Sequence, residues 1–200
     1  MLFFFHVAIA TVIYTSWRGF RDAYVSQTAA VAKSLRDDLT GLANRRELLS
    51  VLTDRLHEAR IGRTGLSLVY ADLDGFKEVN DSYGHEIGDL LLKAVAAGFA
   101  HLAQDMGLVA RLGGDEFAII VTGEDSTARS RELANNMISF LSEPMIFGGR
   151  VASVSVSVGI VDLEKDDADV EEIIRRADVA MYAAKSAGRP DAARLLADLT

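Results

Sequence analysis

Two short apolar runs joined through a Gly-Gly corner limit what this chain can fold into. Residues 108–112 and 117–121 are apolar apart from one arginine, and residues 113–116, Gly-Gly-Asp-Glu, separate them. Because glycine adopts positive φ without steric cost, the pattern predicts a β-hairpin. Two adjacent carboxylates at its tip suit divalent-metal and phosphate chemistry, while a solvated acidic turn is the plainer alternative.

The composition narrows the class of function. The chain has 200 residues, of which 50% are hydrophobic and 25% charged, enough for one folded domain with a short extension. Its formal net charge of −8 argues against nucleic acid as a partner. The absence of cysteine excludes disulfides, thiolate nucleophiles and cysteine-type zinc sites. The 4 histidines lack the spacing of metal ligands.

The N-terminal residues 2–17 are almost entirely apolar and are followed at once by Arg18 and Arg21. The stretch is shorter than the roughly 20 residues of a membrane-spanning helix, and it lacks the basic start of a signal peptide. Cations after an apolar segment are typical of the cytoplasmic flank of a membrane helix. We therefore interpret residues 1–17 as part of a membrane segment that attaches the chain to the inner face of the cytoplasmic membrane. A helix packed against protein is the alternative.

Residues 18–37 are predicted to form a helical stalk or linker. Apolar and small residues recur at spacings of three and four between Val25 and Leu39, as in a short coiled-coil seam. An amphipathic helix lying on its own domain would give the same pattern. A stalk that pairs two copies would raise the local concentration of the partners.

The remaining sequence alternates between helical and extended patterns. Apolar periodicity predicts helices over about residues 45–59, 86–103, 127–141 and 170–187, and strands over 66–71, 108–112, 117–121, 145–147 and 151–161. Residues 73–85 are predicted to be irregular, Leu90 to point inward, and the tail after Pro190 to be helical. Helices mixed with hairpins favour an α+β fold, with one sheet flanked by helices.

Further carboxylates follow the first predicted strand of the domain. Asp72 ends this buried strand, and Asp74 comes two residues later. A buried carboxylate is costly unless it is paired or bound to a metal. If the strand lies beside the hairpin, Asp72, Asp115 and Glu116 converge at one edge of the sheet, where hard oxygen ligands suit Mg²⁺ or Mn²⁺ bound with a phosphate. Capping of the next turn is the alternative role for Asp72 and Asp74.

Five blocks of sequence carry a resemblance to a known family. They are DDLTGLANRR (37–46), DLDGFKEVNDSYGHEIGD (72–89), RLGGDEF (111–117), SVSVGI (155–160) and ADVAMYAAKSAGR (177–189). In this order they resemble the GGDEF domain of diguanylate cyclases, over residues 38–189, with residues 190–200 as a tail or linker. The resemblance implies a fold like nucleotidyl cyclases and polymerase palms, with a central, mostly antiparallel sheet flanked by helices. It also implies condensation of two GTP into cyclic di-GMP and two pyrophosphates.

The resemblance assigns catalysis and metal binding to the carboxylates described above. Asp72, Asp115 and Glu116, with the backbone carbonyl of Leu73, would hold Mg²⁺ or Mn²⁺, two ions to a site and about 3.5–4 Å apart. Glu116 would be a metal ligand or would assist deprotonation of the attacking 3′-hydroxyl. Because each domain holds one GTP, catalysis would need a homodimer.

The GTP-binding residues implied by the resemblance come from three of the blocks. Asn80 and Asp89 match the pair that reads guanine, whose N1–H and N2–H₂ edge adenine lacks. The positions that would receive the phosphates are Phe76, Lys77, Gly113, Gly114, Lys185 and Arg189. Helix capping by Asp89, and a solvated cationic helix end at Lys185 and Arg189, are the alternatives. His85 matches a family position without an assigned role.

The sequence departs from the family pattern in two places. Many members carry an inhibitory product site, Arg-x-x-Asp, before the signature, and its two positions here hold Gln104 and Gly107. Without the arginine fork and its carboxylate, we expect no feedback inhibition through this site. After residue 189 the chain has a proline and a helix-like segment where the family has an asparagine and a short strand.

The sequence therefore predicts an active diguanylate cyclase. A catalytically silent domain that binds GTP and passes on a signal is the alternative, and a cyclase making a cyclic mononucleotide or a mixed purine dinucleotide is a third. The intact Asp72, Asp115 and Glu116 argue against a silent domain, and Asp89 argues against adenine. No sensory domain lies within these residues, so they do not name the input signal.

Overall fold

The computed structural model describes residues 17–18, 34–62, 65–163, 169–186 and 194–195. The chain divides into two units, Met1–Arg36 and Asp37–Thr200. The predicted membrane segment and most of the predicted stalk lie outside the described residues, apart from the helical pair 17–18 and residues 34–36. Among the helices that are described, none is both long and apolar enough to cross a membrane.

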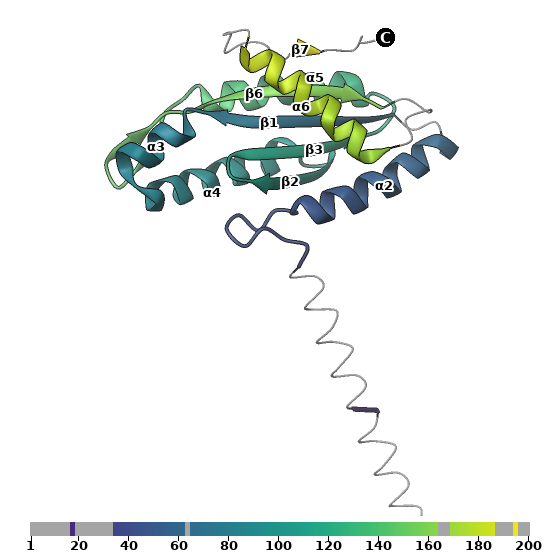
Figure 1. Ribbon diagram of the computed structural model, residues 1–200, viewed down its shortest axis with the longest axis horizontal. Helices are drawn as coiled ribbons and strands as arrows, with labels where there is room; N and C mark the ends of the chain where they lie inside the picture. Colours follow the sequence, from purple (N-terminus) through teal and green to yellow (C-terminus); the bar gives the residue numbers. More distant parts are fainter. Residues whose placement is uncertain (1–16, 19–33, 63–64, 164–168, 187–193, 196–200) are drawn as a thin grey trace, which may run out of the picture. The chain divides into compact units, whose positions relative to one another are not determined.

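The second unit is built around a five-stranded sheet of order β2-β3-β1-β6-β7 (Figure 1). Its strands are β1 (Leu66–Asp74), β2 (Gly107–Gly113), β3 (Glu116–Thr122), β6 (Ser155–Asp162) and β7 (Arg194–Leu195). The strands pair antiparallel except β7, which runs parallel to β6. A separate two-stranded sheet contains β4 (Met145–Phe147) and β5 (Arg150–Ala152). The predicted α+β class with a mostly antiparallel sheet is confirmed.

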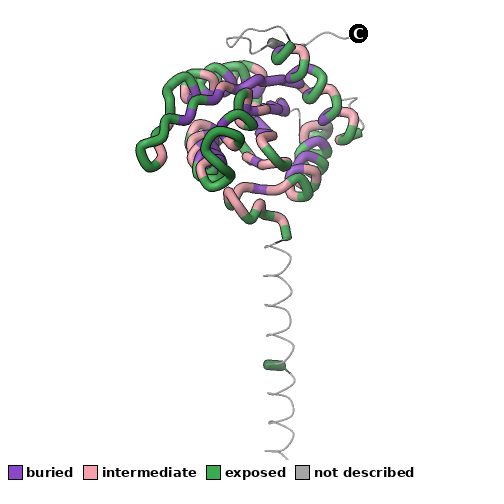
Figure 2. The backbone as a smooth tube through the Cα atoms, turned by 60° about the vertical axis from the view of Figure 1, so that its left-hand side comes forward, coloured by how far each residue is buried: buried purple, intermediate pink, exposed green. Residues whose placement is uncertain are grey.

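Helices pack against both faces of the sheet (Figure 1). They are α2 (Arg45–Gly62), α3 (Phe76–Tyr83), α4 (His85–Leu102), α5 (Ser126–Leu141) and α6 (Val170–Ser186). Successive residues of β1 point to opposite faces, so Ala71 packs in the cluster that includes Phe99 of α4, whereas Tyr70 packs with α2 and α6. The buried residues accordingly lie along the strands of the sheet and on parts of the helices (Figure 2).

The helix α3 corrects the prediction of an irregular segment. Gly75 and Gly84 bound it with φ of 85° and 83°, a conformation that glycine adopts most readily. Between them Val79 is buried, so one apolar residue fixes a helix too short for its periodicity to be recognised in the sequence.

Three further details of the sequence prediction were wrong. The stretch 151–161 is not one strand, because the chain leaves the small sheet after Ala152 and enters the main sheet at Ser155. Leu90 is 45% exposed, since the buried stripe of α4 runs instead through Leu91 and Leu92. In the tail, residues 194–195 form a strand against β6 rather than a helix.

Candidate active site

Acidic residues of β1 and of the β2–β3 hairpin meet at one edge of the sheet. β1 lies next to β3, and the pairing register sets Asp72 opposite Glu116. The turn of the hairpin follows β1 closely, because the N–H of Leu73 donates to the carbonyl of Asp115 at 3.2 Å. The convergence of Asp72, Asp115 and Glu116 expected from the sequence is therefore present.

The Gly-Gly corner beside these carboxylates is open. Gly113 and Gly114 have φ of 146° and 53°, which side chains rarely tolerate. Both glycines are exposed, and a Cβ built on either would meet no atom within 4 Å. Their backbone conformation explains why glycine stands here, and the bare surface that results lets a ligand approach the main chain closely.

Arg111 fixes this corner, and sequence reasoning did not single it out. Its Nε and Nη2 donate to the carbonyl of Gly114 at 3.0 and 2.7 Å, and its Nη1 donates to Asp37 Oδ1 and Oδ2 at 3.0 and 3.1 Å. Asp37 also accepts from the N–H and hydroxyl of Thr40 at 2.9 and 2.5 Å. One guanidinium therefore joins the start of the second unit to the signature turn. The sequence feature that could have identified Arg111 is its place as the single charged residue in an apolar strand.

The carboxylates at this edge repel one another. Burial raises the pKa of Asp72, and the neighbouring Asp115 and Asp74 raise it further, outweighing the effect of Lys185. Burial likewise raises the pKa of Glu116, and the negative charges of Asp72 and Asp178 raise it further. A cation among these oxygens would relieve the repulsion, because it favours the ionised forms.

The donor set fits a hard divalent cation that is also bound by a ligand's phosphates. Carboxylate oxygens and the carbonyl of Leu73 are the donors that Mg²⁺ and Mn²⁺ prefer, and Mg²⁺ takes one or two carboxylates together with phosphates and waters. Among the described residues no three acidic or histidine side chains already surround a common point as a metal cage.

Lys185 of α6 lies against the carboxylates of β1. Its ammonium contacts Asp72 Oδ1 and lies 3.4 Å from Asp74 Oδ1. The hydroxyl of Ser157, which faces β1 from β6, donates to Asp74 Oδ2 at 2.7 Å and holds that carboxylate in place. Lys185 thus offsets charge at the acidic edge, and its side chain remains 43% exposed.

The residues predicted to bind the nucleotide base lie on α3 and α4. Asn80 of α3 is half-buried, whereas Asp89 of α4 is exposed. Neither side chain makes a hydrogen bond to another described residue. Lys77 and His85 are exposed at the first turns of the two helices, and Phe76 packs partly against the core. Arg189 lies outside the described residues.

The positions of the family's inhibitory product site lie just before and at the start of β2. Gly107 has φ of 156°, and a Cβ there would lie 2.1 Å from the carbonyl oxygen of Ile120. The preceding turn includes Asp105 at φ 63°, and Arg129 donates to its carbonyl at 2.8 Å. Any side chain at position 107 therefore collides with β3 in this backbone, while Gln104 is exposed.

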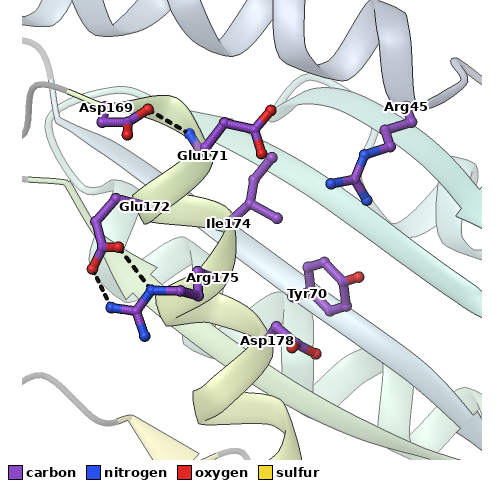
Figure 3. A pocket seen from close by; sticks show the side chains of 8 residues that line it. All are labelled: Arg45, Tyr70, Asp169, Glu171, Glu172, Ile174, Arg175 and Asp178. Atoms are coloured by element: carbon purple, nitrogen blue, oxygen red, sulfur yellow. Dashed lines mark hydrogen bonds and ion pairs between the residues drawn. The ribbon is translucent and has the colours of Figure 1, made fainter.

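A pocket of about 390 Å³ lies on the face of the sheet that packs α2 and α6 (Figure 3). Its lining residues are Arg45, Tyr70, Asp169, Glu171, Glu172, Ile174, Arg175 and Asp178. Arg45 extends from α2 towards Tyr70 (Figure 3). The Tyr70 hydroxyl, as a hydrogen-bond partner, partly offsets the rise in the pKa of Glu116. Arg175 is paired with Glu172, so carboxylates outnumber free cations in the lining. The sequence did not indicate this pocket.

The fold and this acidic edge define an α+β domain of the nucleotidyl-cyclase type. The chain belongs to the GGDEF family, because the model of the diguanylate cyclase GGDEF domain matches residues 34–191.

Relatives and solved structures agree with this assignment. The bifunctional diguanylate cyclase/cyclic di-GMP phosphodiesterase MucR of Pseudomonas aeruginosa is 36% identical over 156 residues, 78% of this chain and 23% of MucR. The GGDEF domain of YfiN (TpbB) from the same species is 35% identical with a TM-score of 0.76, covering 82% of this chain and 95% of that one. The coiled coil and GGDEF domain of DgcB from Caulobacter crescentus, in complex with c-di-GMP, is 26% identical with a TM-score of 0.82, covering 95% and 99%. The chain spans 18 to 26% of the length of the first curated relatives it matches.

Proposed function

We propose that this chain carries the catalytic domain of a diguanylate cyclase. Two copies would each hold one GTP and together form cyclic di-GMP and two pyrophosphates. The observation that carries the proposal is the acidic edge of the sheet. There the strand register sets Asp72 opposite Glu116, beside the open Gly-Gly corner. The catalytic domain would span residues 38–189, preceded by the stalk and followed by a tail or linker.

Asp72, Asp115, Glu116 and the Leu73 carbonyl would hold the metal ions. Bound Mg²⁺ or Mn²⁺, two in each site, would neutralise phosphate charge and orient the attacking and leaving oxygens. Glu116 would be one of the metal ligands or would accept the proton of the attacking 3′-hydroxyl. In the reaction this hydroxyl oxygen bonds to the α-phosphorus of the GTP on the other copy, and pyrophosphate leaves.

The GTP phosphates would lie across the corner of the hairpin and the end of α6. The bare backbone at Gly113 and Gly114 leaves room for the α-phosphate. Lys185 is exposed enough to turn from Asp72 towards the phosphates. Lys77, the backbone at Phe76 and, beyond the described residues, Arg189 would complete the binding of the triphosphate.

Guanine would be recognised by Asn80 and Asp89, whose polar groups are free of other hydrogen bonds in the described residues. Asp89 would accept from the N1–H and N2–H₂ groups of guanine. Adenine would leave this carboxylate without a donor, and the mismatch of one such group discriminates strongly between bases.

The deciding experiment is incubation of the full chain with GTP, ATP and Mg²⁺, followed by identification of the products by mass. We expect cyclic di-GMP from GTP, and no product from Asp115→Asn or Glu116→Gln proteins that still fold. A cyclic mononucleotide or a product containing adenine would contradict the proposal, and so would the absence of any dinucleotide at every protein concentration.

A silent GTP-binding domain is the second candidate. It is favoured by the ion pair between Lys185 and Asp72, which already satisfies a proposed metal ligand. Saturable GTP binding with no product over a wide range of protein concentrations would establish it.

We also propose that residues 2–17 attach the chain to the cytoplasmic membrane, with the catalytic domain on the cytoplasmic side. Their apolar character and the arginines that follow support this. Recovery of the full chain in the soluble fraction of gently lysed cells would contradict membrane attachment.

A further inference from the structure

We propose that Gly88 is a positioning residue for base recognition. By lacking a side chain it leaves the space that the carboxamide of Asn80 fills beside the first turn of α4. This inference rests on the proposed function, in which Asn80 and Asp89 bind guanine.

The carboxamide of Asn80 lies directly over Gly88. A Cβ on Gly88 would lie 2.0 Å from Asn80 Oδ1, 3.0 Å from its Cγ and 3.4 Å from its Nδ2. These three atoms are the nearest neighbours of the missing side chain, and all belong to one carboxamide. An alanine and the observed position of Asn80 therefore cannot coexist.

The backbone conformation at position 88 does not require glycine. Gly88 lies inside α4 and is not among the glycines with positive φ. Glycine is also the poorest helix former apart from proline. Its use within the first two turns of α4 is explained by the packing of Asn80 and not by conformation.

The carboxamide held in this way has its polar atoms free for a ligand. The backbone of Asn80 is fixed, because its carbonyl accepts from the N–H of Gly84 at 2.9 Å and its neighbour Val79 is buried. The side chain is half-buried and makes no hydrogen bond within the described part of the chain. Asp89 follows Gly88 directly, so α3 and α4 present an amide and a carboxylate at adjoining positions.

This pair matches the edge of guanine. The amide of Asn80 can donate to acceptors such as O6 or N7, and the carboxylate of Asp89 can accept from N1–H and N2–H₂. Moving the carboxamide away would remove one half of the recognition without disturbing the acidic edge. Gly88 would therefore act on affinity and base choice and not on the chemical step.

The direct test is Gly88→Ala in the full chain. The atom it displaces is the end of a side chain, so the fold should persist, as circular dichroism and thermal unfolding would report. We expect the KM for GTP to rise about tenfold or more while kcat at saturating GTP changes little. Titration with a non-reactive GTP analogue should show the same loss of affinity. The exposed Lys93 of α4 offers the control, since Lys93→Ala should change neither parameter.

A double-mutant cycle with Asn80→Ala separates the proposed role from any other effect of Gly88. With Asn80 truncated, no carboxamide lies where the new Cβ would be, so Gly88→Ala should cause no further loss of affinity and should raise the thermal stability of α4. An equal loss of affinity in both backgrounds would overturn the inference, and so would failure of both Gly88→Ala proteins to fold. If the unsubstituted chain bound no GTP analogue, the proposed function would fail before Gly88 was tested.

Discussion

At the scale of single residues, Arg111 supports the Gly-Gly corner of the site, although the sequence did not single it out. Its guanidinium binds the Asp37 carboxylate and the Gly114 carbonyl together, and its side chain is only 10% exposed. Asp37 begins the second unit, and Gly114 forms the open corner. The geometry of the corner therefore depends on a contact that crosses 74 residues of sequence.

The first prediction concerns Arg111→Lys. Lysine keeps the charge but cannot make the forked contact, so the Gly114 carbonyl loses its two side-chain donors. We expect the free energy of unfolding to fall by about 1–3 kcal/mol and kcat to fall at least tenfold. Urea unfolding and initial rates with GTP measure these effects. Arg55→Lys, in an exposed pair with Glu58, should change neither, and a normal kcat in Arg111→Lys would refute the role of Arg111.

The second prediction concerns Asp37 and pH. Burial raises the pKa of this carboxyl, but the hydrogen bonds from Thr40 and the contact with Arg111 outweigh burial and lower it overall. A carboxyl whose pKa is lower in the folded state stabilises the fold above its unfolded pKa, about 3.9, and loses this contribution as pH falls through the folded value. Asp37→Asn should therefore unfold at lower urea concentrations than the unsubstituted protein at pH 6, with the gap closing below about pH 4. A gap that stays constant with pH would contradict the role of its charge.

At the scale of elements, the position of α6 is set by how closely it approaches β6. A Cβ on Gly159 of β6 would lie 2.3 Å from the N of Met181 and 2.4 Å from the O of Ala177. These are backbone atoms of α6, so no side-chain rotation can relieve the clash. The same helix carries Lys185 to the β1 carboxylates, so one glycine in a strand determines where a cation reaches the site.

The third prediction is that Gly159→Ala pushes α6 away from the sheet. We expect a loss of about 1–3 kcal/mol in the free energy of unfolding, together with weaker GTP binding as Lys185 is displaced. Gly98→Ala is the matched control, because its nearest neighbour is the end of the Phe140 ring, which can rotate. Urea unfolding and analogue titration compare the two variants. A larger loss of stability or of analogue affinity in Gly98→Ala than in Gly159→Ala would contradict the proposed role of Gly159.

The main helices and strands, and the meeting of Asp72 with Asp115 and Glu116, could be predicted because they follow from local periodicity and from where strands end. Two kinds of feature could not be predicted from the sequence. The short helix α3 and the break between β5 and β6 depend on single buried residues or turns, which leave no period in the sequence. Supporting contacts such as Ser157 with Asp74, 83 residues apart, depend on tertiary packing that one sequence does not reveal.

At the scale of the whole molecule, the proposed reaction needs two copies, because each acidic edge belongs to one domain and would hold one GTP. The second unit has its own core and begins at Asp37, which also anchors Arg111. The proposed role of the first unit is to bring two second units together.

The fourth prediction is that removal of residues 1–36 lowers specific activity at low protein concentration. The activity of the truncated protein should rise faster than linearly with concentration and approach that of the full chain when concentrated, since only the effective concentration of partners has changed. Initial rates over a dilution series, together with sedimentation to measure the dimer, provide the comparison. Equal specific activity at every dilution would remove the stalk hypothesis.

The start of β2 has a consequence for how such an enzyme could evolve or be re-engineered. Because any side chain at position 107 strikes the carbonyl of Ile120, two point mutations that supply the missing arginine and aspartate would not restore a product-sensing site. The loop held by Arg129 would have to be replaced as a block, with a different path into the strand. In the proposed reaction, product bound at positions 104 and 107 would not slow synthesis, so the pairing of two copies would be the remaining control within this part of the chain.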